Sequence, residues 1–280
     1  MIEAGSTRDG RSAVFAPART TRAAWAGLLG LGFVTNFFDT LGVGSFATTT
    51  AAFKIGRIID DEDIPGTLNV GHSLPTMLEA VLYITVIRVE LPTLVSMIAA
   101  GALGSWFGAG WVIRWSRLTI QRALAVALLI TAVIMTLRQL HFFPPGGDAL
   151  GLTGIALVAA IVANAFIGSL ASLGIGNYAP CMAVVSLLGM NPTAAFPIMM
   201  GSAALILPAA ALRFLSSRKF DRNTAIGLAV GGIPGVLIAA FIVKSLPLDA
   251  VRWLVVGVLS YTSILMWRSA LTEARAKEAA

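Results

Sequence analysis

Three ionisable side chains stand inside otherwise apolar stretches of the sequence: Asp39, His72 and Glu79. An acid near the centre of a bilayer costs roughly 2.5 to 3.5 kcal/mol on insertion scales, so intramembrane acids usually serve function. His72 and Glu79 are seven positions apart and therefore share one helix face. A proton-coupled carrier needs a group that titrates in a polar cavity, and we predict Glu79 first, then His72 and Asp39, as proton-coupling residues. Each has a structural alternative, since Asp39 could cap a helix and His72 could be a hydrogen-bonded packing residue.

Two short stretches with the core Leu-Gly-aliphatic-Gly interrupt the apolar pattern, at residues 39–45 and 172–177. Paired glycines let a helix break at membrane depth, and a new helix is expected after each break. Helix starts leave N–H groups unpaired and carry partial positive charge, so two facing starts would form an anion site. The alternative is that the glycines only allow close helix packing. The predicted substrate-binding residues are Gly42, Gly44, Ser45, Thr48, His72, Ser73, Gly174, Gly176, Asn177 and Ser202.

The composition excludes a soluble globular protein. The 280 residues are 57% hydrophobic and only 12% charged, against about half and about a quarter in soluble domains. Six apolar runs are each long enough to cross a bilayer as a helix, and they lie at 65–87, 92–113, 119–137, 193–212, 224–243 and 252–267. The sequence therefore predicts an all-α, polytopic membrane helix bundle.

An internal duplication is indicated by the spacing of matching residues. The two glycine breaks are 132 positions apart, while Gly71 and Gly201, like Gly101 and Gly231, are 130 apart. For Gly101 and Gly231 themselves, we favour a packing role. The predicted domains are a first repeat at 23–140, a linker outside the cytoplasm at 141–150 and a second repeat at 151–268. Each repeat is a glycine-broken helical hairpin plus three full spans, and an odd number of full spans makes the two repeats inverted.

Basic residues set the expected orientation. The net charge is +6, and most Lys and Arg stand in short loops beside the helices, where they are topology signals and not a nucleic-acid site. All strongly basic loops fall on one side if a disordered tail at 1–22 and a second tail at 269–280 are both cytoplasmic. The acid run at 60–63 is expected to be a solvated loop, with a cation site as the alternative. Whether the hairpins span the membrane fully or re-enter stays open.

No catalytic or cofactor signature is present in the sequence. We find no zinc-protease, nucleophile-elbow or nucleotide-binding motif. The single cysteine, Cys181, excludes an internal disulfide and a cysteine-based metal cage. We therefore expect no cofactor, no metal and no enzyme activity.

The chain resembles the sulfite exporter TauE/SafE family of membrane permeases. The similarity is carried by the two breaks and by two segments that follow them, Val70-Gly71-His72-Ser73-Leu74 and Met200-Gly201-Ser202-Ala203-Ala204. It implies a multi-spanning carrier of the bacterial inner membrane that moves sulfur oxyanions or organosulfonates with an ion gradient. The chain departs from the family pattern in its shorter glycine runs and in His72, which stands where a hydroxyl residue is expected.

These observations lead to one main hypothesis and two alternatives. The main hypothesis is a secondary transporter for a small sulfur-containing anion such as sulfite, thiosulfate or an organosulfonate, with H⁺ as the expected coupling ion and membrane lipid as its surroundings. A passive anion channel or an uncoupled regulatory membrane component is the alternative. An intramembrane enzyme is disfavoured, and a homodimer is left open.

Overall fold

The computed structural model of the protein describes residues 22–41, 43–84, 88–142, 147–174, 176–191, 194–242 and 248–278. These residues form ten α-helices and one short 3₁₀ helix, so the predicted all-α fold is confirmed. Of the N-terminal tail predicted at 1–22, residues 1–21 lie outside the described residues. The predicted binding residue Gly42 also lies outside them. The tail predicted from residue 269 is helical as far as Glu278.

The helices follow the two predicted hairpins and the spans after them. The first half of the chain contains α1 (Arg22–Thr40), α2 (Ser45–Gly56), η1 (Asp61–Asp63), α3 (Ile64–Ile84), α4 (Leu91–Val112) and α5 (Arg117–Gln139). The second half contains α6 (Gly154–Ala171), α7 (Tyr178–Leu187), α8 (Ala195–Ser217), α9 (Arg222–Ile242) and α10 (Leu248–Glu278). Both glycine stretches therefore separate two helices, as the sequence predicts, and Gly44 and Gly174 adopt positive φ angles of 92° and 105°.

Among the described residues, five helices are long and apolar enough to cross a membrane by length and composition. They are α4, α5, α6, α8 and α9. The helix α3 is not among them, although it is 21 residues long, because buried polar residues such as Asn69, His72 and Glu79 interrupt its apolar run. The chain is thus a multi-pass helical membrane protein, and two of the predicted coupling residues, His72 and Glu79, are buried on α3.

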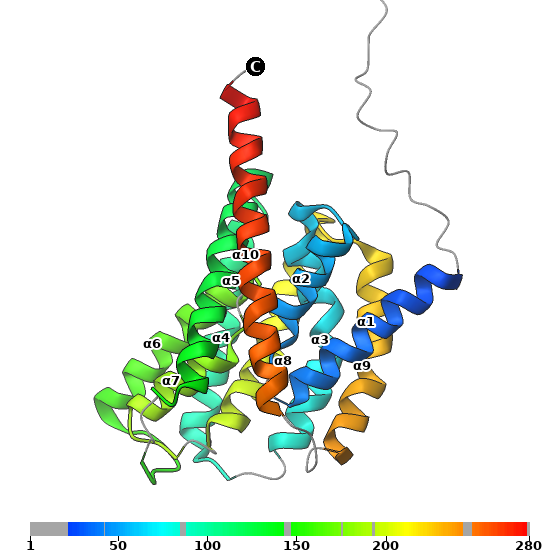
Figure 1. The fold of residues 1–280 in the computed structure, drawn as a ribbon. Coiled ribbons are helices and arrows are strands. Elements are labelled where there is room, and N and C mark those ends of the chain that lie inside the picture. Colours follow the sequence, from blue (N-terminus) through cyan, green and yellow to red (C-terminus); the bar gives the residue numbers. More distant parts are fainter. Residues whose placement is uncertain are drawn as a thin grey trace, which may run out of the picture.

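The helices pack in a regular pattern around a central pair. The helices α3 and α8 pack on each other, and α5 packs on α10. On one flank α1 lies against α9, and on the other flank α6 lies against α4 (Figure 1). In the same figure α10 is the long upright helix beside α5. Each broken hairpin is therefore held by a long helix from the opposite half of the chain.

Glycines allow these flanking helices to approach closely. A Cβ atom on Gly231 of α9 would collide with the carbonyl oxygen of Leu29 in α1. On the other flank, a Cβ on Gly168 of α6 would collide with the carbonyl oxygen of Gly101 in α4. Small residues at such contacts let van der Waals packing act at short range in lipid. The predicted packing role of Gly101 and Gly231 is confirmed.

The acid run at 60–63 is only partly the solvated loop predicted from the sequence. Asp60 and Glu62 are exposed, but Asp61 is buried. The Nζ atom of Lys54 donates to both oxygens of Asp61 at 3.0 and 2.8 Å, and Gln121 Nε2 donates to Asp61 Oδ2 at 2.9 Å. The solvated-loop prediction is wrong for Asp61, because this carboxylate joins the end of α2 to α5.

Gly231→Ala is expected to destabilise the protein by about 1 to 3 kcal/mol, since the new methyl group forces α1 away from α9. Gly257→Ala on α10 is the matched control, because a Cβ there meets nothing within 4 Å. Thermal unfolding of the two purified variants measures the difference. Equal melting temperatures for both variants would contradict the close α1–α9 contact.

Asp63 provides a pH test outside the spanning helices. Partial burial, with the charges of Glu62, Asp60 and Asp221, raises the pKa of Asp63 to about 6. Because the pKa of Asp63 is higher in the folded than in the unfolded protein, its contribution to folding stability is complete below about pH 4. That contribution is lost as the pH rises through 6. Asp63→Asn should therefore stabilise the protein by on the order of 1 kcal/mol at pH 7.5, after allowing for solvent screening. Thermal unfolding from pH 4 to 7.5 should show this advantage shrinking in acid; an advantage that grows in acid would contradict it.

Candidate functional site

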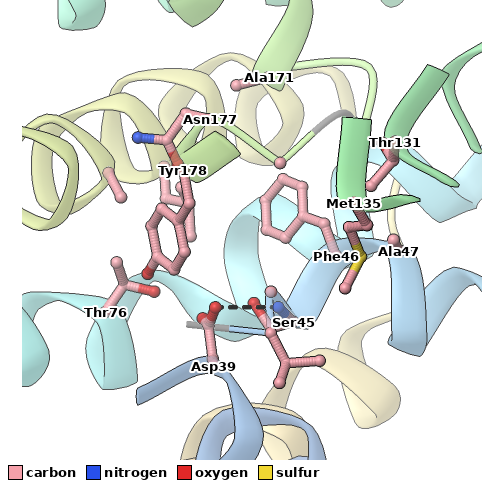
Figure 2. Close-up of a pocket in the computed structure, with 15 residues that line it drawn as sticks. Asp39, Ser45, Phe46, Ala47, Thr76, Thr131, Met135, Ala171, Asn177 and Tyr178 are labelled. Atoms are coloured by element: carbon pink, nitrogen blue, oxygen red, sulfur yellow. Dashed lines mark hydrogen bonds between the residues drawn. The ribbon is translucent and has the colours of Figure 1, made fainter. Parts of the chain in front are cut away.

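The two glycine breaks line one internal cavity. Its wall includes Gly44 and Ser45 from the first break and Gly176 and Asn177 from the second. The volume is about 50 Å³, which accommodates a few water molecules or a similarly small group. The remaining lining residues are Asp39, Val43, Phe46, Ala47, Thr76, Thr131, Met135, Ala171, Tyr178, Ala203 and Leu207. Figure 2 shows side chains from both halves of the chain converging on this space.

Asp39 connects the first break to the start of α2. The backbone N–H of Ser45 donates to Asp39 Oδ1 at 2.9 Å, and this bond is dashed in Figure 2. The carboxyl group therefore caps the helix, because it satisfies an N–H that has no partner within α2. The described residues that line the cavity include no Lys, Arg or His. The cavity thus offers an acidic wall, and one helix start that was predicted to hold a substrate anion is capped by the protein's own carboxyl group.

Glu79 lies directly behind this wall and is 0% exposed. The Thr40 hydroxyl donates to Glu79 Oε1 at 2.7 Å, and the Tyr178 hydroxyl donates to Glu79 Oε2 at 3.0 Å. The Tyr83 hydroxyl donates to the carbonyl oxygen of Thr40 at 2.7 Å. Glu79 is close enough to Asp39 for their charges to interact. Tyr178 lines the cavity, so it links Glu79 to that space.

His72 is placed between two helices, away from the lining of the cavity. Its Nδ1 lies 3.0 Å from Asn36 Oδ1, and its Nε2 lies 3.0 Å from Thr49 Oγ1. The Asn36 amide nitrogen donates to the carbonyl of Gly32 at 2.7 Å, which fixes Oδ1 toward the ring as an acceptor. His72 Nδ1 is then the donor, and the Thr49 hydroxyl donates to Nε2. A neutral imidazole satisfies both of these contacts. They are the contacts expected if His72 is a hydrogen-bonded packing residue, the alternative to its proposed role in proton coupling.

Four other predicted binding residues make contacts within the helix bundle. Thr48 donates to the carbonyls of Gly44 and Ser45, and Ser73 donates to Asn69 O. The Ser202 hydroxyl accepts from Asn164 Nδ2 at 2.9 Å, and Gly174 packs near Leu124 and Leu68. The structure therefore brings Gly44, Ser45, Gly176, Asn177 and Asp39 to the cavity and leaves Thr48, His72, Ser73, Gly174 and Ser202 out of its lining.

Three polar residues at the cavity were missed by the sequence analysis: Tyr178, Thr76 and Thr131. Tyr178 directly follows the second break, and its position next to Asn177 was the available signal. Thr76 is on α3, three residues before Glu79 and so on the same helix face. Thr131 and Met135 of α5 also line the cavity, and nothing in their apolar sequence surroundings marks them.

The fold and the cavity define a multi-pass membrane protein in which two broken helical hairpins meet inside a helix bundle. Residues 155–280 match the family described as "Sulfite exporter TauE/SafE", so the resemblance is confirmed over this part of the chain. This is a family of transporters, not enzymes, and its name implies sulfite export. The curated proteins and the solved structures that were searched contain no match to the chain.

Proposed function

We propose that the protein is a secondary transporter that moves a small sulfur-containing anion across the bacterial inner membrane by alternating access. The observation that carries the proposal is the single cavity lined by both glycine breaks. Broken helices that meet near the middle of a membrane are the usual construction of carrier binding sites. The family match over residues 155–280 supports sulfite or a related oxyanion as the substrate.

An inverted-repeat architecture is part of this proposal, and the packing supports it. Under the sequence correspondence, α1 matches α6 and α4 matches α9, so the contacts of α1 with α9 and of α6 with α4 are equivalent. The same holds for single residues. A Cβ on Gly71 would meet Leu228, a Cβ on Gly201 would meet Ile98, and both pairs of positions are 130 apart. If each half can adopt the conformation of the other, the protein has two equivalent conformations, one open to each side of the membrane.

Charge balance favours coupling of the anion to a proton. An anion that enters a cavity bordered by carboxyl groups is repelled unless these groups are neutralised. The hydroxyl of Thr40 has one proton, yet it lies 2.9 Å from the carbonyl of Asn36 and 2.7 Å from Glu79 Oε1. A charged Glu79 leaves this one proton shared between two acceptors, whereas a protonated Glu79 donates to the Thr40 hydroxyl and leaves the Thr40 proton for the carbonyl of Asn36. Glu79 is therefore the proposed proton carrier, and the basic loops favour cytoplasmic chain ends.

Transport by purified protein in liposomes tests the substrate. We expect saturable uptake of at least one labelled anion among sulfite, thiosulfate, sulfoacetate and taurine, with accumulation against its gradient when a pH gradient is imposed. Uptake that does not saturate and cannot be driven uphill would favour a passive channel. Absence of uptake of every sulfur anion would exclude the proposed substrate class.

Glu79→Gln tests the proton carrier and has His72→Gln as its matched control. For one coupled proton, the accumulation ratio of the anion changes about tenfold per unit of pH gradient. We expect Glu79→Gln to lose this dependence while still exchanging anion for anion, because glutamine preserves the shape of the side chain. His72→Gln should keep the dependence, since His72 lies outside the cavity lining. A normal pH response in Glu79→Gln, or a lost response in His72→Gln, would contradict the assignment.

A further inference from the structure

One buried hydroxyl at the cavity has no hydrogen-bond partner. Thr76 Oγ1 makes no hydrogen bond although the residue is only 1% exposed. Thr76 lines the cavity, and Figure 2 shows it beside the hydroxyl end of Tyr178 and on the same side as Asp39. A buried polar group without a partner costs about 1 to 3 kcal/mol, so its place beside an acidic cavity indicates a ligand.

Oxygen atoms dominate the polar surroundings of Thr76. Asp39 Oδ1 accepts from the Ser45 N–H, and the side chains of Ser45 and Tyr178 also interact with this carboxylate, so three oxygen-bearing side chains lie together here. The Tyr178 hydroxyl donates its proton to Glu79, so its oxygen lone pairs remain as acceptors. Val43 and Gly44 bring unwound backbone to the same wall. Carboxylate, hydroxyl and carbonyl oxygens are the ligands of hard cations, and transporters coordinate Na⁺ at such unwound segments.

We propose that Asp39, Thr76 and Tyr178, with the backbone of Val43 and Gly44, form a binding site for a monovalent hard cation of the Na⁺ class. A singly charged ion suits the site, because the described residues contain no group of three His, Cys, Asp or Glu that could hold a metal ion. Only one carboxylate lines the described cavity wall, and Glu79 stands behind it with Tyr83 nearby. The carboxylate of this site comes from the first half alone, since Ala171 occupies the position that matches Asp39.

The cation site gives the cavity a second function if the proposed transport is correct. A bound cation neutralises Asp39, and this removes the repulsion that an arriving anion would meet. Because coupling between two sites is reciprocal, the anion would raise the affinity for the cation by the same factor. The substrate would then travel with a cation held at Asp39, separately from the proton carried by Glu79.

Thermal unfolding of the full-length protein in detergent tests the cation site without any transport. At pH 7.5 and constant ionic strength, NaCl is compared with choline chloride, KCl and LiCl. We expect NaCl or LiCl to raise the melting temperature by about 2 to 4 °C over choline chloride, as binding to the folded state requires. Equal melting temperatures in all four salts, or a rise produced only by acid, would overturn the proposal.

Matched variants locate the site. Asp39→Asn keeps an oxygen for the cap of Ser45 but removes the charge, and Thr76→Val removes the unpartnered hydroxyl while keeping the side-chain shape. Both should lose the cation-dependent shift, whereas Thr76→Ser should keep it. Thr50→Val is the control, because Thr50 is fully buried and its hydroxyl donates within α2 to Phe46. A full shift in Thr76→Val, or a lost shift in Thr50→Val, would overturn the assignment.

The same variants separate this inference from the proposed function. A cation-dependent shift without uptake of any sulfur anion would leave the cation site standing and exclude the substrate. Uptake with no cation-dependent shift would support the transporter and overturn the cation site. A shift together with anion uptake that is independent of Na⁺ and Li⁺ would overturn the coupling role.

Discussion

The structure depends on a carboxyl group held at a break in a membrane helix. Asp39 lies in the last turn of α1, accepts from the first N–H of α2, and borders the cavity between the two hairpins. Asp39 thereby stabilises the turn at the first glycine break and also places a carboxyl group on the wall of the cavity. No basic side chain among the described lining residues compensates this charge. Any anion that uses the cavity must therefore arrive with a positive partner, or after a proton has neutralised the acid.

A hydrogen-bonded cluster extends this acidic wall toward the second half of the chain. Glu79 on α3 accepts hydrogen bonds from the hydroxyl of Thr40 at the first break and from the hydroxyl of Tyr178 at the start of α7. A change in the charge of Glu79 therefore acts on both hairpins at once. Tyr178 is the one described member of this cluster from the second half, so its hydroxyl is the contact through which the acidic half can influence the other. The two halves are therefore packed similarly but differ in charge at the cavity, and the proposed coupling residues all come from the first half.

Much of the fold follows from the sequence, because apolar length and glycine spacing determine where helices form and break. Both breaks and most limits of the spans agree with the pattern within a few residues, but α10 continues to Glu278, eleven residues past the end of the predicted run at 252–267. The site was harder to predict. The glycine breaks predicted Gly44, Ser45, Gly176 and Asn177. The place of His72 depends instead on its angular position on α3 and on its hydrogen bonds with Asn36 and Thr49. Thr76, Thr131 and Met135 reach the cavity through tertiary packing, for which no local pattern exists.

The central claim is that the two breaks meet at one cavity that opens alternately to the two sides of the membrane. The most direct test uses a variant with Ser45→Cys and Asn177→Cys, in which Cys181 is replaced by alanine. Short bifunctional thiol reagents measure whether the two new cysteines cross-link, and thiol labelling from each side of the membrane measures their accessibility. The account predicts that the two cysteines cross-link and that substrate with a coupling cation shifts their labelling from one side to the other. Failure to cross-link, or labelling from one side only under all conditions, would contradict it.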